Sequence, residues 1–152
     1  MNKKSTVILL KILYVILVIS FIAFIFSNSL ESREVSSSKS TGIVEKINEV
    51  LEQIHPQLSI KEVFVRKSAH FIEYFILGSL VFGFMIMNRF SKFKYFIYPC
   101  FFCCLIAMTD ETIQYFSQRG SMLIDVWLDL TSSVFALLML YLIHKGYVKI
   151  KK

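Results

Sequence analysis

The stretch RKSAHFIEYFILGSLVFGFMIMN, residues 66–88, decides the fold of this 152-residue chain. Its polar beginning leads into about 20 mainly apolar residues, the length that an α-helix needs to cross the hydrocarbon core of a bilayer. Three other runs of similar length and composition occur in the chain. The sequence therefore predicts a single all-α membrane domain, residues 1–152, with four transmembrane helices, at residues 7–26, 69–88, 95–116 and 122–143.

The overall composition agrees with a membrane protein. Apolar residues make up 55% of the chain and aromatic residues 15%, more than a small soluble core uses. Lys3 and Lys4 precede the first apolar run, as in a secretory signal peptide. A signal-peptide core has about 7–15 apolar residues, and this run is longer, so we expect an uncleaved membrane anchor.

The distribution of basic residues predicts the orientation. If the four runs alternate across the membrane, the N-terminus, the short loop between the second and third runs, and the C-terminal tail share one side. That side carries Lys3, Lys4, Arg89, Lys92, Lys94, Lys145, Lys149, Lys151 and Lys152. The positive-inside rule then places both termini in the cytoplasm, although the loop at residues 27–68 also contains lysines and arginines. The net charge of +6 indicates anionic lipid as a partner and, without a base-stacking or groove-reading module, argues against nucleic acid.

The loop at residues 27–68 is expected to lie outside the cell. Its opening part, residues 27–41, contains the serine-rich residues 36–41 and has the composition of a flexible connector. Residues 42–55 place apolar side chains at helical spacing opposite charged ones, which predicts an amphipathic helix that ends at Pro56. This helix could lie on the membrane surface or cover the bundle as a lid. Residues 59–62, Ser-Ile-Lys-Glu, have the spacing of a capping box and predict a new helix running into the second span.

Several intramembrane residues are best explained by packing. Cys100, Cys103 and Cys104 lie within the third run, where thiols behave as small apolar groups. Gly78 and Gly83 are expected at helix contacts. Aromatic residues near the outer ends of the helices are expected at the lipid interface, namely Tyr74, Tyr115 and Trp127.

Ionisable side chains gather at one depth when the runs are threaded through a membrane. Arg66, His70 and Glu73 share one helix face, while Asp110 and Gln114 share another, with Glu111 about 100° away. Bundled with these faces inward, the helices form a polar pocket near the outer leaflet, with the loop at Arg119 and Gly120 across its mouth. The candidate site residues are Arg66, Lys67, His70, Glu73, Asp110, Glu111, Gln114, Arg119, Asp125 and Asp129. Buried charges are costly in lipid, so such a cluster indicates a function.

These residues resemble the VanZ-like family of bacterial membrane proteins. The resemblance covers the last three runs and rests on RKSAHFIEYFILG at residues 66–78, DETIQYFSQR at residues 110–119, and Asp125 with a polar residue four positions on. It implies an association with teicoplanin resistance in Gram-positive bacteria and supplies no catalytic mechanism. Many members have Asn at the position of Asp129 and glycine at those of Ser132 and Ala136, so this chain has an additional acid.

The chemistry of the cluster is left open by the sequence. It could be a structural hydrogen-bonded network. It could hold a divalent metal, the only cofactor that the residues suggest, and the candidate ligands are His70, Glu73, Asp110, Asp125 and Asp129. His70 could also exchange a proton with Asp110 or Glu111 as an acid–base pair. Finally, the cluster could bind a polar headgroup, a cell-wall precursor or a glycopeptide without reacting.

Two functional hypotheses follow. The first is a membrane protein that modulates the cell envelope and glycopeptide tolerance. The second is an outer-leaflet enzyme acting on a lipid-linked phosphate, for which a metal ion would bind the phosphate or activate water. A lipid or glycan product that depends on the intact pocket would favour the enzyme.

Overall fold

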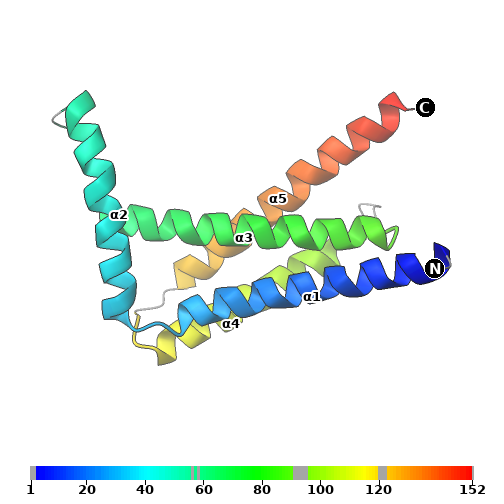
Figure 1. Cartoon of the computed structure of the whole chain (residues 1–152), viewed down its shortest axis with the longest axis horizontal. Helices are drawn as coiled ribbons and strands as arrows, with labels where there is room; N and C mark the ends of the chain where they lie inside the picture. The colour runs from blue at the N-terminus through cyan, green and yellow to red at the C-terminus, as the bar shows by residue number, and fades with distance from the viewer. Residues whose placement is uncertain (1–2, 56, 58, 91–95, 120–122, 152) are drawn as a thin grey trace.

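The computed structural model describes residues 3–55, 57, 59–90, 96–119 and 123–151. Within these residues the chain forms five helices and the all-α prediction is confirmed (Figure 1). The helices are α1 (Lys3–Ser29), α2 (Arg33–Ile54), α3 (Glu62–Met87), α4 (Ile97–Phe116) and α5 (Leu123–Ile150). Pro56, Lys92, Lys94, Gly120 and Lys152 lie outside the described residues.

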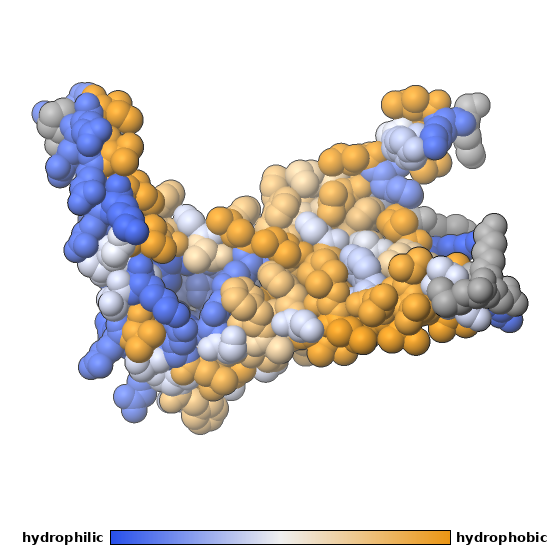
Figure 2. Space-filling view, viewed as in Figure 1, coloured by the Kyte–Doolittle hydropathy of each residue, from blue (hydrophilic) through white to orange (hydrophobic). Residues whose placement is uncertain are grey.

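Four helices run lengthwise and α2 stands across one end of them (Figure 1). We call this end of the bundle the α2 end. Both chain termini lie at the opposite end, because α1 and α4 run toward the α2 end while α3 and α5 run away from it. The most extensive helix contact is between α3 and α5, and α1 packs on α3 and α4. In Figure 2 hydrophilic side chains gather over α2 and the neighbouring end, whereas hydrophobic side chains cover most of the remaining face.

Three of the described helices are long and apolar enough to cross a membrane: Lys4–Ser29, Glu62–Met87 and Leu123–Ile150. They overlap three of the four predicted spans, those at residues 7–26, 69–88 and 122–143. The helix α4 is not among them, because Asp110, Glu111 and Gln114 lower its mean hydropathy. These three polar side chains are nevertheless buried against protein, and the 20 residues of α4 rise about 30 Å.

Small residues bring α3 and α5 together. A Cβ atom on Gly78 would lie 2.5 Å from the backbone oxygen of Ser133, so the two backbones are in direct contact. The Ser133 hydroxyl donates to the Tyr74 carbonyl at 3.1 Å, and the Ser132 hydroxyl donates to the Phe71 carbonyl. The predicted role of Gly78 in helix contact is therefore confirmed.

The helix α1 is tied to α3 away from the α2 end. Gly83 lies against Tyr14, whose hydroxyl donates to the Leu80 carbonyl at 2.8 Å. The Lys11 ammonium donates to the Asn88 side chain at 2.9 Å. Gly83 is thus a helix-contact residue, as predicted, and these contacts fix the position of α1 along α3.

The predicted connector at residues 27–41 is wrong, because residues 27–29 belong to α1 and residues 33–41 belong to α2. The Ser32 hydroxyl caps the helix by accepting from the Val35 backbone N–H at 3.5 Å, and the Ser40 hydroxyl donates to the Ser36 carbonyl at 3.0 Å. Ser36 and Ser40 are buried. Tertiary contacts and local hydrogen bonds thus outweigh the weak helix propensity of serine.

The predicted capping box at residues 59–62 is also wrong. The helix α3 begins at Glu62, and Lys61 precedes it without a side-chain cap. Asn48 of α2 instead fixes the approach to α3. Its side-chain oxygen accepts from the Ile60 N–H at 2.8 Å, and its side-chain nitrogen donates to the Ile60 carbonyl at 3.2 Å. One helix then runs through the second predicted span without interruption.

Asn48→Ala is expected to loosen the junction of α2 and α3. It removes both hydrogen bonds to Ile60, each of which contributes about 1 kcal/mol. Amide hydrogen exchange should become faster at residues 60–64, while the lengthwise helices keep their protection. Glu49→Ala, at the neighbouring exposed position, is the control. Equal exchange in the two variants would show that the Asn48 hydrogen bonds do not hold the junction.

Candidate functional site

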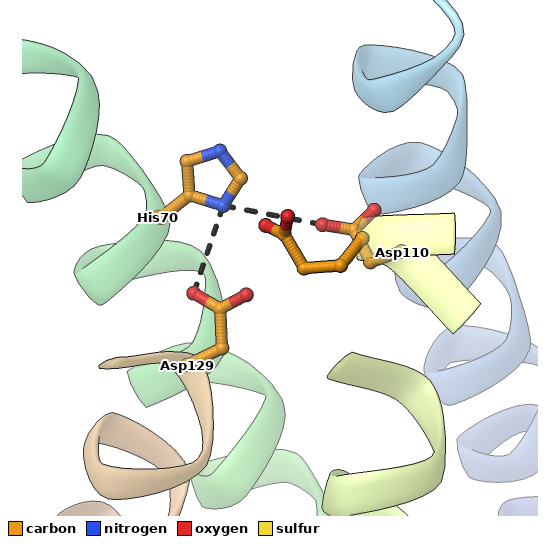
Figure 3. A group of neighbouring side chains, drawn as sticks. His70, Asp110 and Asp129 are labelled. Atoms are coloured by element: carbon orange, nitrogen blue, oxygen red, sulfur yellow. Dashed lines mark ion pairs between the residues drawn. The ribbon is translucent and has the colours of Figure 1, made fainter. Parts of the chain in front are cut away.

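His70, Asp110 and Asp129 meet at the centre of a polar cluster at the α2 end (Figure 3). They come from α3, α4 and α5. The His70 Nδ1 atom lies 3.6 Å from Asp129 Oδ1 and 3.9 Å from Asp110 Oδ2. Both aspartate side chains are fully buried, and the histidine side chain is 13% exposed. Acidic side chains are almost never so deeply buried without a compensating partner.

Asp110 is held in place by two neighbours. The Ser29 hydroxyl, at the end of α1, donates to Asp110 Oδ1 at 2.5 Å. The Gln114 side-chain nitrogen donates to Asp110 Oδ2 at 3.0 Å and lies 3.4 Å from the Ser29 hydroxyl oxygen. Since Gln114 is one turn beyond Asp110 on α4, the two residues orient each other.

Asp129 has a different environment. Neither of its carboxylate oxygens accepts a hydrogen bond from the part of the chain that the structure describes, and His70 Nδ1 likewise has no hydrogen-bond partner there. Glu111 is also buried, with 6% of its surface exposed. One possible ligand atom from each of His70, Asp110, Glu111 and Asp129 lies within 4.8 Å of the others. We call these four residues the acid–histidine cluster.

Arg119 joins the ends of three helices. Its guanidinium donates to the Asn28 carbonyl at the end of α1 and, at 2.6 Å, to the Ser36 hydroxyl of α2. The Asn28 side chain in turn donates to Glu73 Oε1 at 2.7 Å. Partial burial lowers the pKa of the Arg119 guanidinium, and the nearby Asp110 carboxylate opposes this shift.

The outer rim of the cluster is more accessible. The Lys67 ammonium lies 2.8 Å from Asp125 Oδ1, and these side chains are 42% and 22% exposed. They border a small cleft of about 20 Å³, whose other lining residues are Arg66, His70, Gln114, Arg119 and Leu128. This volume accommodates about one water molecule, so a lipid headgroup or a peptide needs a wider opening.

The structure places all ten predicted site residues at the α2 end, but it separates them into groups. His70, Asp110, Glu111 and Asp129 form the acid–histidine cluster. Gln114 supports Asp110. The predicted metal ligands Glu73 and Asp125 contact Asn28 and Lys67 instead. Arg66 lines the cleft together with Lys67 and Arg119.

Some site residues were missed by sequence reasoning. Asn28, Ser29 and Ser36 contact the predicted site residues, although residues 27–41 were interpreted as a connector. The available signal was the polar sequence Ser-Asn-Ser at residues 27–29, at the depth of the other polar groups.

The prediction that Tyr74 lies in an aromatic belt at the lipid interface is wrong. Its side chain is fully buried, and its hydroxyl has no hydrogen-bond partner among the described residues. Trp127 and Tyr115, at 59% and 70% exposed, are accessible as an interfacial position requires. Tyr74 packs inward because it lies on the face of α3 that meets α5.

The comparisons with known proteins give one result. A protein-family model described as VanZ/LLP1 matches residues 11–144. This range covers most of the chain and includes every predicted site residue. No curated protein and no solved structure matches the chain significantly.

Proposed function

Because the chain belongs to the VanZ/LLP1 family, we propose that it is a bacterial cell-membrane protein that modulates the envelope and increases tolerance of the glycopeptide teicoplanin. This role follows the association of VanZ-like proteins with teicoplanin resistance. Its proposed ligand is a cell-wall precursor or the glycopeptide itself, bound at the polar groups of the α2 end. The observation that carries the proposal is the burial of the acid–histidine cluster within a matched family region.

The proposed topology has α1, α3, α4 and α5 as four spans. In this topology α4 crosses the membrane with its polar side chains turned toward protein. Arg89, Lys145 and Lys149 lie at the end with the termini, which the positive-inside rule assigns to the cytoplasm. The α2 end then faces the outer leaflet. Exposed Ile43, Ile47 and Val50 give α2 an apolar surface that can rest on lipid.

Ligand binding in this proposal begins at the cleft rim. The cleft holds about one water molecule in the present conformation. The Lys67–Asp125 ion pair is partly exposed, and such pairs contribute only about 0–1 kcal/mol. Separation of this pair therefore widens the cleft at low cost, and it offers the Lys67 cation and the Asp125 anion to an incoming polar group.

The proposal is tested by teicoplanin susceptibility. A susceptible Gram-positive host should tolerate more teicoplanin when it expresses the wild-type chain. Asp110→Asn and His70→Gln preserve approximate side-chain shape but change charge or proton exchange, and they should return tolerance to the empty-vector level. All variants must be compared at equal membrane abundance. No protection by the wild type would refute the proposed role, and equal protection by all three would refute the role of the cluster.

A second candidate is an outer-leaflet enzyme that acts on a lipid-linked phosphate. His70 Nδ1 faces Asp129 at 3.6 Å and Asp110 at 3.9 Å, so a small side-chain movement would bring it within hydrogen-bond distance of either carboxylate for proton exchange. Mass spectrometry of lipids from the same strains distinguishes the candidates. A new lipid species that requires His70 and Asp110 indicates catalysis, whereas tolerance with unchanged lipids indicates binding.

A further inference from the structure

We propose that the acid–histidine cluster is a binding site for one divalent cation, Mn²⁺ or Zn²⁺. The ligands are His70, Asp110, Glu111 and Asp129. This inference concerns the ion alone and does not depend on the proposed role in teicoplanin tolerance.

The four side chains converge from three helices. One ligand atom from each lies within 4.8 Å of the others. Nitrogen and oxygen ligands lie about 2.0–2.2 Å from Zn²⁺, so the four ligand atoms of a tetrahedral site are about 3.4 Å apart. Side-chain movements of less than about 1 Å therefore bring all four atoms to coordination distance. Such movements need only small torsional changes, without displacement of a helix.

Asp129 supplies an independent reason for a cation. Its side chain is fully buried, and neither carboxylate oxygen accepts a hydrogen bond from the described part of the chain. His70 Nδ1 faces it at 3.6 Å, also without a hydrogen-bond partner there. Buried polar groups normally have partners, and buried charges are paired or coordinate metals. A cation between these atoms satisfies both groups together.

The combination of one nitrogen ligand with oxygen ligands determines which divalent cations fit the site. One imidazole with three carboxylates suits Mn²⁺ and Zn²⁺, whereas Ca²⁺ and Mg²⁺ prefer oxygen ligands alone. Soft ions such as Cu⁺ prefer sulfur, and the thiol of Cys103 belongs to the hydrophobic core.

The hydrogen bonds around Asp110 also resemble those that orient metal ligands in other proteins. Carboxylate ligands are usually oriented by hydrogen bonds from neighbouring residues. Asp110 has two such bonds, from Ser29 on one oxygen and from Gln114 on the other. A carboxylate oxygen can accept more than one partner, so these bonds leave room for an ion on the side that faces His70.

Two nearby acids provide matched controls. Glu73 accepts a hydrogen bond from Asn28, and Asp125 forms an ion pair with Lys67. Both lie at the same end of the bundle, but neither belongs to the acid–histidine cluster. Glu73→Gln and Asp125→Asn therefore remove one negative charge each without removing a ligand. Asp129→Asn and Glu111→Gln remove the same charge and also weaken coordination.

The test is the metal content of the purified full-length chain in detergent. Each protein is incubated with Mn²⁺ or Zn²⁺ alone, separated from free metal by gel filtration, and analysed by inductively coupled plasma mass spectrometry. The wild type and both controls should retain about one ion per chain, and Asp129→Asn and Glu111→Gln should retain almost none. The same ion should raise the melting temperature of the wild type but not of these two variants.

Two outcomes overturn the proposal. One is a folded wild type that retains neither ion. The other is an equal loss of metal in the cluster variants and the controls, which shows nonspecific attraction to acids. Circular dichroism identifies a variant that fails to fold. If either Asp129→Asn or Glu111→Gln fails to fold, the metal content of the other variant tests the proposal. No antibiotic enters the assay, so failure of the metal site and failure of the proposed function are distinguishable.

Discussion

Gly78→Ala is expected to lower the free energy of unfolding by about 2–3 kcal/mol, the cost of overpacking a tight contact. The added Cβ would lie 2.5 Å from the Ser133 backbone oxygen and 2.9 Å from its Cα atom. Neither atom belongs to a flexible side chain, so α3 and α5 must separate. The separation also lengthens the hydrogen bonds from Ser132 and Ser133 to the α3 backbone.

Thermal unfolding in detergent measures this effect, and a decrease of about 5–10 °C corresponds to the expected loss. Gly146→Ala is the matched control, because a Cβ at Gly146 meets no atom within 4 Å. The same chemical change should be neutral or stabilising there, since alanine has the higher helix propensity. A Gly78→Ala protein as stable as the Gly146→Ala protein would show that α3 and α5 do not approach so closely.

Arg119→Ala is expected to destabilise the α2 end by about 3 kcal/mol, the scale for losing hydrogen bonds from a charged donor. The substitution removes the donors to the Asn28 carbonyl and to the Ser36 hydroxyl. It also removes a positive charge beside Asp110. We therefore expect α2 to detach from the end of α1, while the α3–α5 contact persists.

Hydrogen exchange along α2, combined with thermal unfolding, measures how far Arg119→Ala destabilises the α2 end. Arg119→Lys keeps the charge but lacks the planar arrangement of donors, so its effect should be intermediate. Arg33→Ala is the control, because Arg33 is exposed at the beginning of α2. If exchange along α2 changes as much in Arg33→Ala as in Arg119→Ala, the cause is the loss of a charge near α2 and not the contacts of Arg119.

The helices were largely predictable because apolar length is a strong local signal. Residues 69–87 of the predicted second span lie within α3, and His70 is one of them. The identity of its neighbours was not predictable in the same way. Glu111 joins the acid–histidine cluster while Glu73 does not, and this depends on the rotation of each helix about its axis. Spacing along one helix does not determine that rotation relative to another helix.

The α2 region shows a second limit of structure prediction from local sequence. Serine-rich sequences are typical of connectors, yet residues 36–41 are helical because Ser36 is buried and accepts a hydrogen bond from Arg119. That partner is 83 residues away in the sequence. The junction with α3 likewise depends on Asn48, 12 residues before Ile60. Contacts over such distances are tertiary, and local propensity does not reveal them.

The length of α5 has a consequence for the depth of the site in the proposed topology. Its 28 residues extend about 42 Å, whereas the hydrocarbon core is about 30 Å thick. Its final turns therefore extend into the headgroup region, where Lys145 and Lys149 meet lipid phosphates. Asp129 precedes Lys145 by 16 residues, which is about 24 Å along the helix axis. If the C-terminal end of α5 is anchored in the headgroup region, Asp129 lies just inside the opposite boundary of the hydrocarbon core. A change in bilayer thickness would therefore alter the access of water to Asp129.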